Sequence, residues 1–268
     1  MAIWIFFAFA SGTNAKSESV NAGFSVQESR AALSTVDRDA FAGQLVLLEQ
    51  GWNRIRVFIP GAEGIDLRSI RLVGNVMIDT LVRLLPRADP SLLLKTLGLM
   101  TGLGPRSYVL VTLHRPSNVD DEAMLTDLLR TLTQIAQTVP VVFPMHPRTR
   151  ARVRPEQLGS DGLMVTEPMT YLDFLGFQRH ASVVVTDSGG IQEETTFLGV
   201  PCLTMRKTTE RPVTVTLGTN ELLGRDTEKL KRRTREILDG HGKAGVVPPL
   251  WDGKAAERVA QQIVERAL

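Results

Sequence analysis

From about Gly61 onward, short apolar runs alternate with segments in which apolar residues recur every three or four positions. Runs rich in β-branched residues predict strands at residues 70–73, 108–113, 140–145, 163–166, 182–186 and 201–205. Helical spacing predicts helices at residues 76–85, 89–100, 120–138, 170–178, 191–198, 227–238 and 254–268, with a short helix near Arg150. Strands that alternate with helices are typical of a doubly wound parallel sheet with helices on both faces, so we expect an α/β fold.

The first sixty residues do not follow this pattern. They are weakly periodic, and they contain no motif that we can assign. The apolar run at residues 1–10 is too short to cross a bilayer as a helix, and no Lys or Arg precedes it, as a secretory signal would require. We expect a buried strand or a stray leader there. We therefore divide the chain into an atypical N-terminal segment, residues 1–60, and a regular domain, residues 61–268.

The composition is that of a globular protein. Of 268 residues, 43% are hydrophobic and 22% charged, enough for a normal core. The 31 basic and 29 acidic side chains nearly cancel, which gives no electrostatic case for nucleic acid or an anionic membrane surface. The single cysteine, Cys202, excludes an internal disulfide and a Cys-based zinc site. Its apolar surroundings predict that Cys202 is buried in the core. We expect the protein to be cytoplasmic.

Polar residues follow several of the predicted strands. In doubly wound sheets, ligands bind beyond the carboxyl ends of the strands. The residues expected at that edge are His114-Arg115, His146-Pro147, Asp187-Ser188-Gly189-Gly190 and Arg206-Lys207. Because parallel strands end at the same edge, these clusters predict one shared ligand site.

The turn Ser188-Gly189-Gly190 has two possible interpretations. Glycine allows a close backbone approach, and the N–H groups of a following helix favour an anion such as phosphate. Alternatively, it is a plain connection whose Ser188 caps the helix. The next acids, Glu193 and Glu194, could accept hydrogen bonds from ribose, or they could be exposed acids that stabilise the helix dipole. Neighbouring helical residues diverge by about 100°, so one acid at most can face a ligand.

His114 and His146, two of four histidines, end neighbouring predicted strands. A histidine there can donate to phosphate or move a proton, or it is a surface residue. The two are not spaced as metal ligands on one helix, so we predict no metal site. The loop that carries Glu210 and Arg211 could hold a diphosphate or a sugar hydroxyl, or be a solvated charged loop.

Together these segments resemble the non-hydrolysing UDP-N-acetylglucosamine 2-epimerases. Six segments carry the resemblance, in this order: GNVMIDTL (74–81), TLHRPSNVD (112–120), FPMHPRT (143–149), YLDFL (171–175), TDSGGIQEE (186–194) and TTERPVTVTLGTN (208–220). The likeness runs from about Ala62 to the C-terminus. It implies the Rossmann-like half of a two-domain nucleotide-sugar fold of the glycosyltransferase-B type, with UDP-GlcNAc in the cleft.

The resemblance implies interconversion of UDP-GlcNAc and UDP-ManNAc for polysaccharide biosynthesis, by elimination and re-addition of UDP, with no metal or other cofactor. It implies that His114, the one catalytic candidate, contacts the diphosphate, and that Ser188, Gly189 and Gly190 hold phosphate oxygens. Glu194 would bind the ribose hydroxyls. The substrate-binding set is completed by Arg115, His146 and Arg211. The family tends to dimerise, which makes a homodimer an expectation.

Two departures from the family pattern bear on activity. Ser117 stands in HRPSN, where the family usually has glutamate. The family's N-terminal segments, GTRPE-like, HVEAGLR-like and PEE-x-NR, supply the acid and base carboxylates, and we find none of them here. We therefore expect a truncated or frame-shifted reading of a longer gene, with weak UDP binding and impaired epimerisation. The alternatives are a UDP-sugar glycosyltransferase-like protein, a hydrolysing epimerase and a catalytically inactive UDP-binding module.

Overall fold

A computed structural model describes residues 71–101, 104–105, 107–158 and 162–267 of the chain. The expectations for residues 1–60, including the apolar run at 1–10, lie outside these residues, as does the start of the family likeness near Ala62. In the described part, a six-stranded parallel sheet forms the centre of an α/β fold, as expected.

The sheet has the strand order of a doubly wound fold. Across it lie β5 (Leu163–Thr166), β4 (Val141–Pro144), β3 (Val109–Thr112), β6 (Val183–Thr186), β7 (Cys202–Thr204) and β8 (Asn220–Leu222). Successive strands run outward from β3 on one side and from β6 on the other, so the order reverses between these two. Thr112 pairs with Thr186, and both strands therefore end at the same level. The crevice beyond such a reversal is where ligands bind in these folds.

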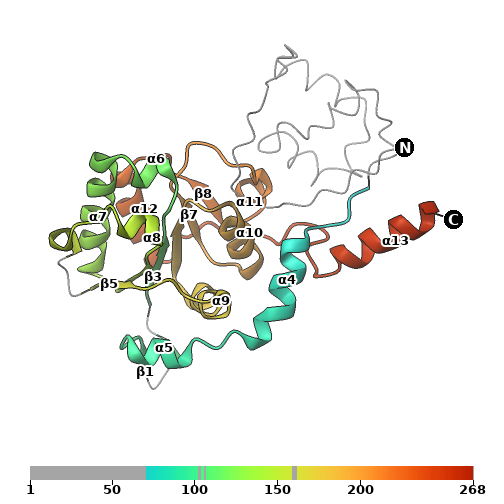
Figure 1. Ribbon diagram of the computed structural model, residues 1–268, viewed down its shortest axis with the longest axis horizontal. Coiled ribbons are helices and arrows are strands. Elements are labelled where there is room, and N and C mark those ends of the chain that lie inside the picture. The colour runs from blue at the N-terminus through green and yellow to red at the C-terminus, as the bar shows by residue number, and fades with distance from the viewer. Residues whose placement is uncertain (1–70, 102–103, 106, 159–161, 268) are drawn as a thin grey trace, which may run out of the picture.

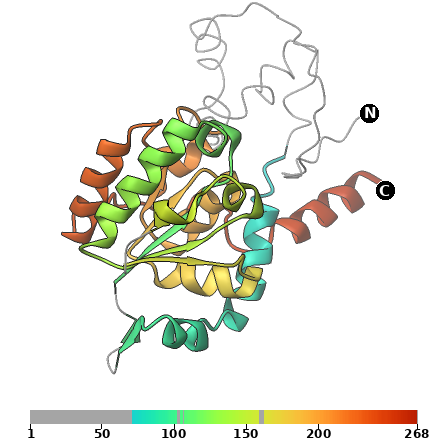
Figure 2. The same cartoon turned by 60° about the vertical axis from the view of Figure 1, so that its left-hand side comes forward.

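Alternate residues of each strand supply two separate cores. Val109 and Val111 face α7 (Glu122–Ala136) and α12 (Thr227–Leu238), whereas Leu110 faces the opposite side. That side is covered by α5 (Ser91–Thr96), α9 (Tyr171–His180) and α10 (Gly189–Leu198). Figures 1 and 2 show the sheet between these two helical layers. Strands buried on both faces explain the continuous apolar runs in the sequence.

Two helices from opposite ends of the described chain pack together. They are α4 (Val76–Leu84), which continues into the 3₁₀ turn η2 (Leu85–Arg87), and α13 (Ala255–Ala267). The Asp79 carboxylate of α4 accepts hydrogen bonds from the backbone N–H groups of Ala255 and Ala256, at 3.0 and 2.7 Å. This contact satisfies the otherwise open start of α13. In Figure 1, α13 runs away from the sheet, and α4 lies between α13 and α10.

Most predicted elements are confirmed to within two residues, but two predictions at the start are wrong. Residues 71–75 form no strand, because Gly74 has φ +99° and the Asn75 side chain caps α4 by accepting from the Met77 N–H. The helix expected at 89–100 is only α5, since Gly98, at φ +66°, follows its end. Beyond it, β1 (Met100–Thr101) pairs antiparallel with β2 (Gly104–Pro105).

The sequence did not predict β8 or the short helices α6 (Pro116–Val119) and α11 (Pro212–Thr216). The short helix near Arg150 is α8 (Pro147–Arg150), followed by the 3₁₀ turn η3 (Pro155–Leu158). Cys202 is fully buried, which confirms its place in the core. None of the helices among the described residues has the length and apolar composition needed to cross a membrane.

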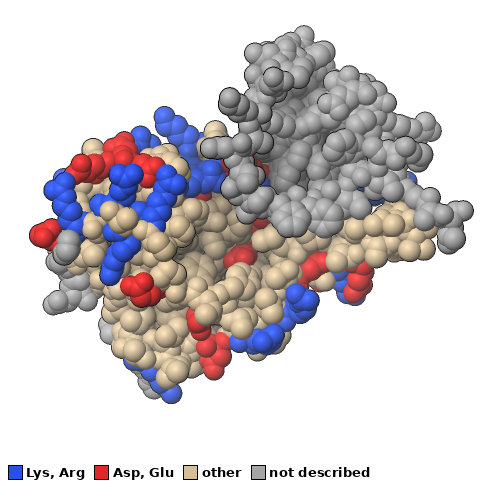
Figure 3. All heavy atoms as spheres, viewed as in Figure 1, with Lys and Arg blue, Asp and Glu red and all other residues tan. Residues whose placement is uncertain are grey.

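Charged side chains of both signs mix on the part of the surface around α6 and α7, at the left of Figure 3. Three arginines from other segments pair there with the acids that open α7: Arg148 with Asp120, Arg225 with Asp121, and Arg154 with Glu122. These side chains are largely exposed, so the pairs add little stability. The mixed signs agree with the near-zero net charge.

Candidate functional site

Asp187 holds together the carboxyl ends of the two central strands. Its side chain is fully buried, and it accepts from the backbone N–H groups of His114 and Arg115, at 3.1 and 2.9 Å. The Asn118 amide donates to it at 3.0 Å. A buried carboxylate with several donors is rigidly placed. The segment after β3 is therefore fixed against the segment after β6 at the point where the strand order reverses.

His114 lies at this edge with one ring nitrogen already engaged. Its Nδ1 is 3.2 Å from the Asp187 carboxylate, and its side chain is 39% exposed. A proton on Nδ1 is held by Asp187, which leaves Nε2 for a ligand. The His146 ring is near, with 5.9 Å between centroids. The structure thus brings together the two histidines that the sequence placed at neighbouring strand ends.

His146 is also the N-cap of α8. Its Nδ1 accepts from the Arg148 N–H at 3.2 Å, and its side chain is exposed. Beside it, at the carboxyl ends of β4 and β5, lies a hollow of about 280 Å³. Its lining residues are Met145, Pro147, Arg150, Ala151, Thr166 and Glu167.

The first turn of α10 is not covered by the residues near it that the structure describes. Ser188 is its N-cap, but the Ser188 hydroxyl makes no capping hydrogen bond, so the reading of a simple serine cap is wrong. A Cβ added to Gly190 would meet none of the described residues within 4 Å, and one added to Gly189 would come within 3.9 Å of the Arg211 guanidinium. Open N–H groups at a helix start, with a cation beside them, suit an anionic ligand.

Glu193 and Glu194 are both buried, so the reading of exposed acids on a helix is wrong. Glu193 accepts from the Asn75 amide at 2.9 Å and lies 2.9 Å from the Arg211 Nε. Burial raises the pKa of Glu193, and the Arg211 charge opposes that rise. Since Glu193 anchors Arg211 to α10, its role here is to place a cation beside the first turn.

Glu194 has a different environment. The Tyr171 hydroxyl of α9 donates to its Oε1 at 3.0 Å. Its Oε2 is buried and has no hydrogen-bond partner among the described residues. Burial raises the pKa of Glu194 to about 7. An unpartnered buried carboxylate oxygen costs free energy, and such groups cluster where ligands bind.

Arg115 and Glu210 belong to a charged cluster beside this site. The Arg115 Nε donates to the Asp187 carbonyl at 2.9 Å, and its guanidinium lies 3.9 Å from Glu210. Arg206 makes two hydrogen bonds to Glu210, at 2.7 and 2.5 Å. Burial acts to raise the pKa of Glu210, but the Arg206 hydrogen bonds outweigh it and lower the pKa to about 2. The loop is thus held by ion pairs, whereas Lys207 is exposed.

A buried amide network fixes the same loop to α10. Gln192 Oε1 accepts from the Thr209 hydroxyl at 2.6 Å and from the Asn220 amide at 3.0 Å. The sequence placed Asp187 at the ligand edge without a specific role, and it gave no role to Gln192, Asn118, Asn75 or Tyr171. Only Asp187 carried a signal, as a carboxylate directly after a predicted strand.

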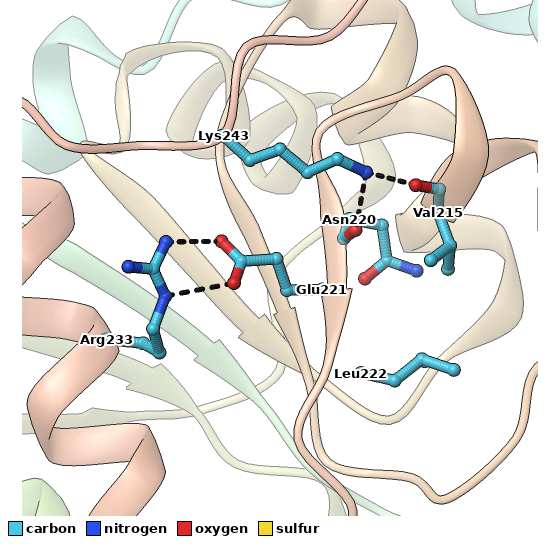
Figure 4. Close-up of a pocket in the computed structure, with 6 residues that line it drawn as sticks. All are labelled: Val215, Asn220, Glu221, Leu222, Arg233 and Lys243. Atoms are coloured by element: carbon cyan, nitrogen blue, oxygen red, sulfur yellow. Dashed lines mark hydrogen bonds and ion pairs between the residues drawn. The ribbon is translucent and has the colours of Figure 1, made fainter.

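A second hollow lies elsewhere. It measures about 560 Å³ and lies along β8, at the edge of the sheet. Figure 4 shows that its charges are satisfied: Arg233 pairs with Glu221, and Lys243 donates to the backbone carbonyls of Val215 and Asn220. Lys243 therefore blunts an exposed strand edge. In the described chain, no group of three or more His, Cys, Asp or Glu side chains could hold a metal ion.

The geometry at the ends of β3 and β6 can be compared with known proteins. The sequence profile of the family described as UDP-N-acetylglucosamine 2-epimerase matches residues 61–264. The chain belongs to this family. A UDP-N-acetylglucosamine 2-epimerase of Methanocaldococcus jannaschii is 34% identical over 206 residues, which cover 74% of this chain and 56% of the relative.

A second relative differs in its sugar. The UDP-2,3-diacetamido-2,3-dideoxy-D-glucuronate 2-epimerase of Pseudomonas aeruginosa is also 34% identical, over 76% of this chain and 55% of the relative. The chain thus spans little more than half the length of the curated relatives that it matches. Identity alone does not separate the two sugars, whereas both names share the UDP part.

Solved structures give the same picture. The Methanocaldococcus jannaschii UDP-GlcNAc 2-epimerase in complex with UDP-GlcNAc and UDP superposes with a TM-score of 0.65 at 32% identity, over 76% of this chain and 57% of that one. The Neisseria meningitidis UDP-GlcNAc 2-epimerase bound to UDP-GlcNAc gives 0.65 at 26% identity, over 76% and 57%. The α/β fold expected from the sequence is therefore the fold of these epimerases.

Proposed function

We propose that this chain forms the UDP-binding part of a UDP-N-acetylglucosamine 2-epimerase. In that reaction a base removes the C2 proton and the C1–O bond to UDP breaks, which leaves 2-acetamidoglucal. UDP then adds back to C1, and a proton returns to C2 on the other face. The part of the reaction that falls to this chain is to hold UDP while it leaves and returns.

The observation that carries this proposal is the open first turn of α10 between His114 and Glu194. Ser188 leaves its hydroxyl uncommitted to capping, and Gly190 leaves space for a ligand. Phosphate oxygens would accept hydrogen bonds from the backbone N–H groups in the first turn of α10, and the Arg211 guanidinium would lie beside them. With both ring nitrogens protonated, the His114 imidazolium would donate to the diphosphate through Nε2 while Nδ1 stays on Asp187, and so assist the departure of UDP.

The ribose would lie farther along α10. Glu194 presents a carboxylate oxygen without a partner among the described residues, as a diol acceptor requires. The exposed His146 would line the sugar side of the cleft, and Arg115 would act mainly by fixing the loops on either side. We place the protein in the cytoplasm, where nucleotide sugars are made, and we expect a homodimer by family resemblance.

Calorimetric titration with UDP tests the proposal. Ser188→Ala should weaken UDP binding by roughly tenfold, because it removes a hydroxyl from a charged ligand. Ser182→Ala is the matched control, since Ser182 precedes the amino end of the same strand β6. Its UDP affinity should equal that of the unmodified chain.

Two results would overturn the assignment of this site. One is an unmodified chain that binds UDP no better than cytidine monophosphate or free phosphate. The other is equal UDP affinity for the Ser188 and Ser182 variants, which would move the ligand away from α10. An inactive UDP-binding module would pass these tests, and only the transfer of solvent deuterium to C2 separates it from an active epimerase.

A further inference from the structure

One side chain links the outer helix α9 to the carboxylate proposed to hold ribose. Tyr171 is the first residue of α9, whose start is capped by Thr170. The Tyr171 ring is partly exposed, at 39%, and its hydroxyl donates to Glu194 Oε1 at 3.0 Å. The two residues lie on different helices, 23 positions apart. No sequence motif predicts this contact.

The contact divides the two oxygens of Glu194 between different tasks. Oε1 is occupied by the phenol, whereas Oε2 has no partner among the described residues. A glutamate side chain has three rotatable bonds, so a carboxylate without such a contact could turn away from a ligand. Binding groups are most effective when a neighbouring hydrogen bond fixes their orientation.

We propose that Tyr171 is a positioning residue: its hydroxyl holds Glu194 Oε1, so that Oε2 faces the ribose hydroxyls of the bound nucleotide. The inference rests on the proposed function, because it takes Glu194 as the ribose-binding group. It adds a residue on α9 to a site otherwise built from α10 and the strand ends.

The charges around Glu194 set how it responds to loss of the phenol. Burial raises the pKa of Glu194 to about 7, Tyr171 and Gln178 of α9 act to lower it, and Glu193 acts to raise it. Glu193 is itself paired with Arg211 and bonded to Asn75 of α4. Burial also raises the pKa of Tyr171, so its hydroxyl remains a donor at neutral pH.

Carboxyl-carbon NMR of ¹³C-glutamate-labelled protein tests the contact without any ligand. Glu194→Gln identifies the Glu194 signal by its loss. In Tyr171→Phe the titration midpoint of Glu194 should rise by about one pH unit, because a donor to the ionised form has been removed. Tyr108→Phe is the matched control: it removes a phenol that donates to the Phe177 carbonyl of the same helix, at 2.5 Å. It should leave the Glu194 midpoint unchanged.

The second measurement compares UDP with 2′-deoxy-UDP by calorimetry between pH 6 and pH 9. The unmodified chain should prefer UDP, and this preference should fall as the pH drops through about 7. In Tyr171→Phe the preference at pH 7 should be lower by roughly tenfold, with the affinity for 2′-deoxy-UDP retained. Tyr108→Phe should keep the full preference.

Each failure has a separate meaning. An unchanged Glu194 midpoint in Tyr171→Phe, or an equal change in Tyr108→Phe, overturns the inference even if UDP binds. A raised midpoint with an unchanged preference for UDP refutes the positioning role. If the unmodified chain does not bind UDP, the proposed function fails, and the ribose role fails with it. The NMR titration would then still show whether Tyr171 and Glu194 are coupled.

Discussion

Adjacent glutamates on α10 show how neighbouring residues take different roles through their surroundings. Glu193 is paired with the Arg211 cation and the Asn75 amide, which offset part of the cost of its burial. Glu194 Oε1 accepts from the Tyr171 phenol, and the Gln178 side chain of α9 lies near enough to lower the pKa of Glu194 as well. Glu194 Oε2 makes no hydrogen bond of normal geometry within the described chain. Such an arrangement lowers stability, and proteins retain it where a ligand supplies the missing partners.

Glu194→Gln should therefore stabilise the free protein at alkaline pH. The folded-state pKa is about 7 against an ordinary 4.5, so the unfolded chain ionises first as the pH rises. The contribution of Glu194 to the free energy of unfolding is thus most favourable below pH 4.5 and falls until pH 7 is passed. The difference corresponds to about 3 kcal/mol, which the glutamine variant should largely recover at pH 8. Urea unfolding at pH 8 and pH 4 measures this, and an equal effect at both would contradict it.

Removal of the Asp187 carboxylate should, in contrast, destabilise the protein. In Asp187→Asn, the new amide N–H group meets backbone donors where the carboxylate accepted. We expect a loss of about 2–4 kcal/mol in the free energy of unfolding, since buried donors lose their acceptor. UDP affinity should also fall, because His114 is no longer held. The matched control is Asp127→Asn. The exposed ion pair between Asp127 and Arg130 contributes no more than about 0.5 kcal/mol to the free energy of unfolding. Similar urea midpoints for the two variants would refute the structural role of Asp187.

At the scale of elements, the strand–turn–helix unit from β6 to α10 uses glycine for two different reasons. Gly199 ends α10 in the left-handed region, at φ +72°, which other residues adopt with strain. Gly190 has no such constraint, and an added Cβ would meet no neighbour among the described residues. The absence of a side chain at Gly190 is therefore explained by the space that it leaves at the helix start.

Gly190→Ala separates ligand binding from folding. The melting temperature should stay the same or rise, because alanine favours a helix over glycine by up to about 1 kcal/mol. UDP affinity should fall at least roughly tenfold, since the methyl group enters the phosphate space. Gly199→Ala should show the reverse, a loss of about 1 kcal/mol in stability with unchanged UDP affinity. Thermal unfolding measures the stability of both variants, and calorimetry measures their UDP affinity. Unchanged UDP affinity in Gly190→Ala would argue against phosphate binding at this turn.

Periodicity predicted the elements that are long or bounded by clear signals. The structure has α12 and β5 at the predicted residues, whereas β8 was missed, since three residues of mixed polarity form no pattern. The strand ends predicted which loops meet. The positions of the strand ends could not predict that Glu193 and Glu194 are buried, because this burial results from the packing of α4 and α9 against α10. The contacts of Asn75 and Tyr171 with these acids depend on tertiary packing alone.

At the scale of the whole molecule, the ligand groups that we propose all lie at one edge of the sheet, so we expect the described residues to contact UDP from one side. The proposed site lies at the carboxyl edge of the sheet, and the matched part of the chain covers 56% of its Methanocaldococcus jannaschii relative. Ligand sites in two-domain folds lie between the domains, where both walls exclude water. Binding of UDP requires one wall, whereas proton transfer at C2 requires a base on the sugar side.

The carboxylates at this edge are already committed to other groups. Asp187 holds His114, Glu193 holds Arg211, and Glu210 holds Arg206. Glu194 is the remaining carboxylate of α10, and we assign it to the ribose, so the described residues leave no carboxylate for the C2 proton. We therefore expect the purified chain to bind UDP but to transfer no solvent deuterium to C2 of UDP-GlcNAc. NMR of the sugar in D₂O measures this, with the full-length Methanocaldococcus jannaschii epimerase as positive control. Turnover comparable to that control would show that this chain contains a base, and it would refute the division of binding from proton transfer.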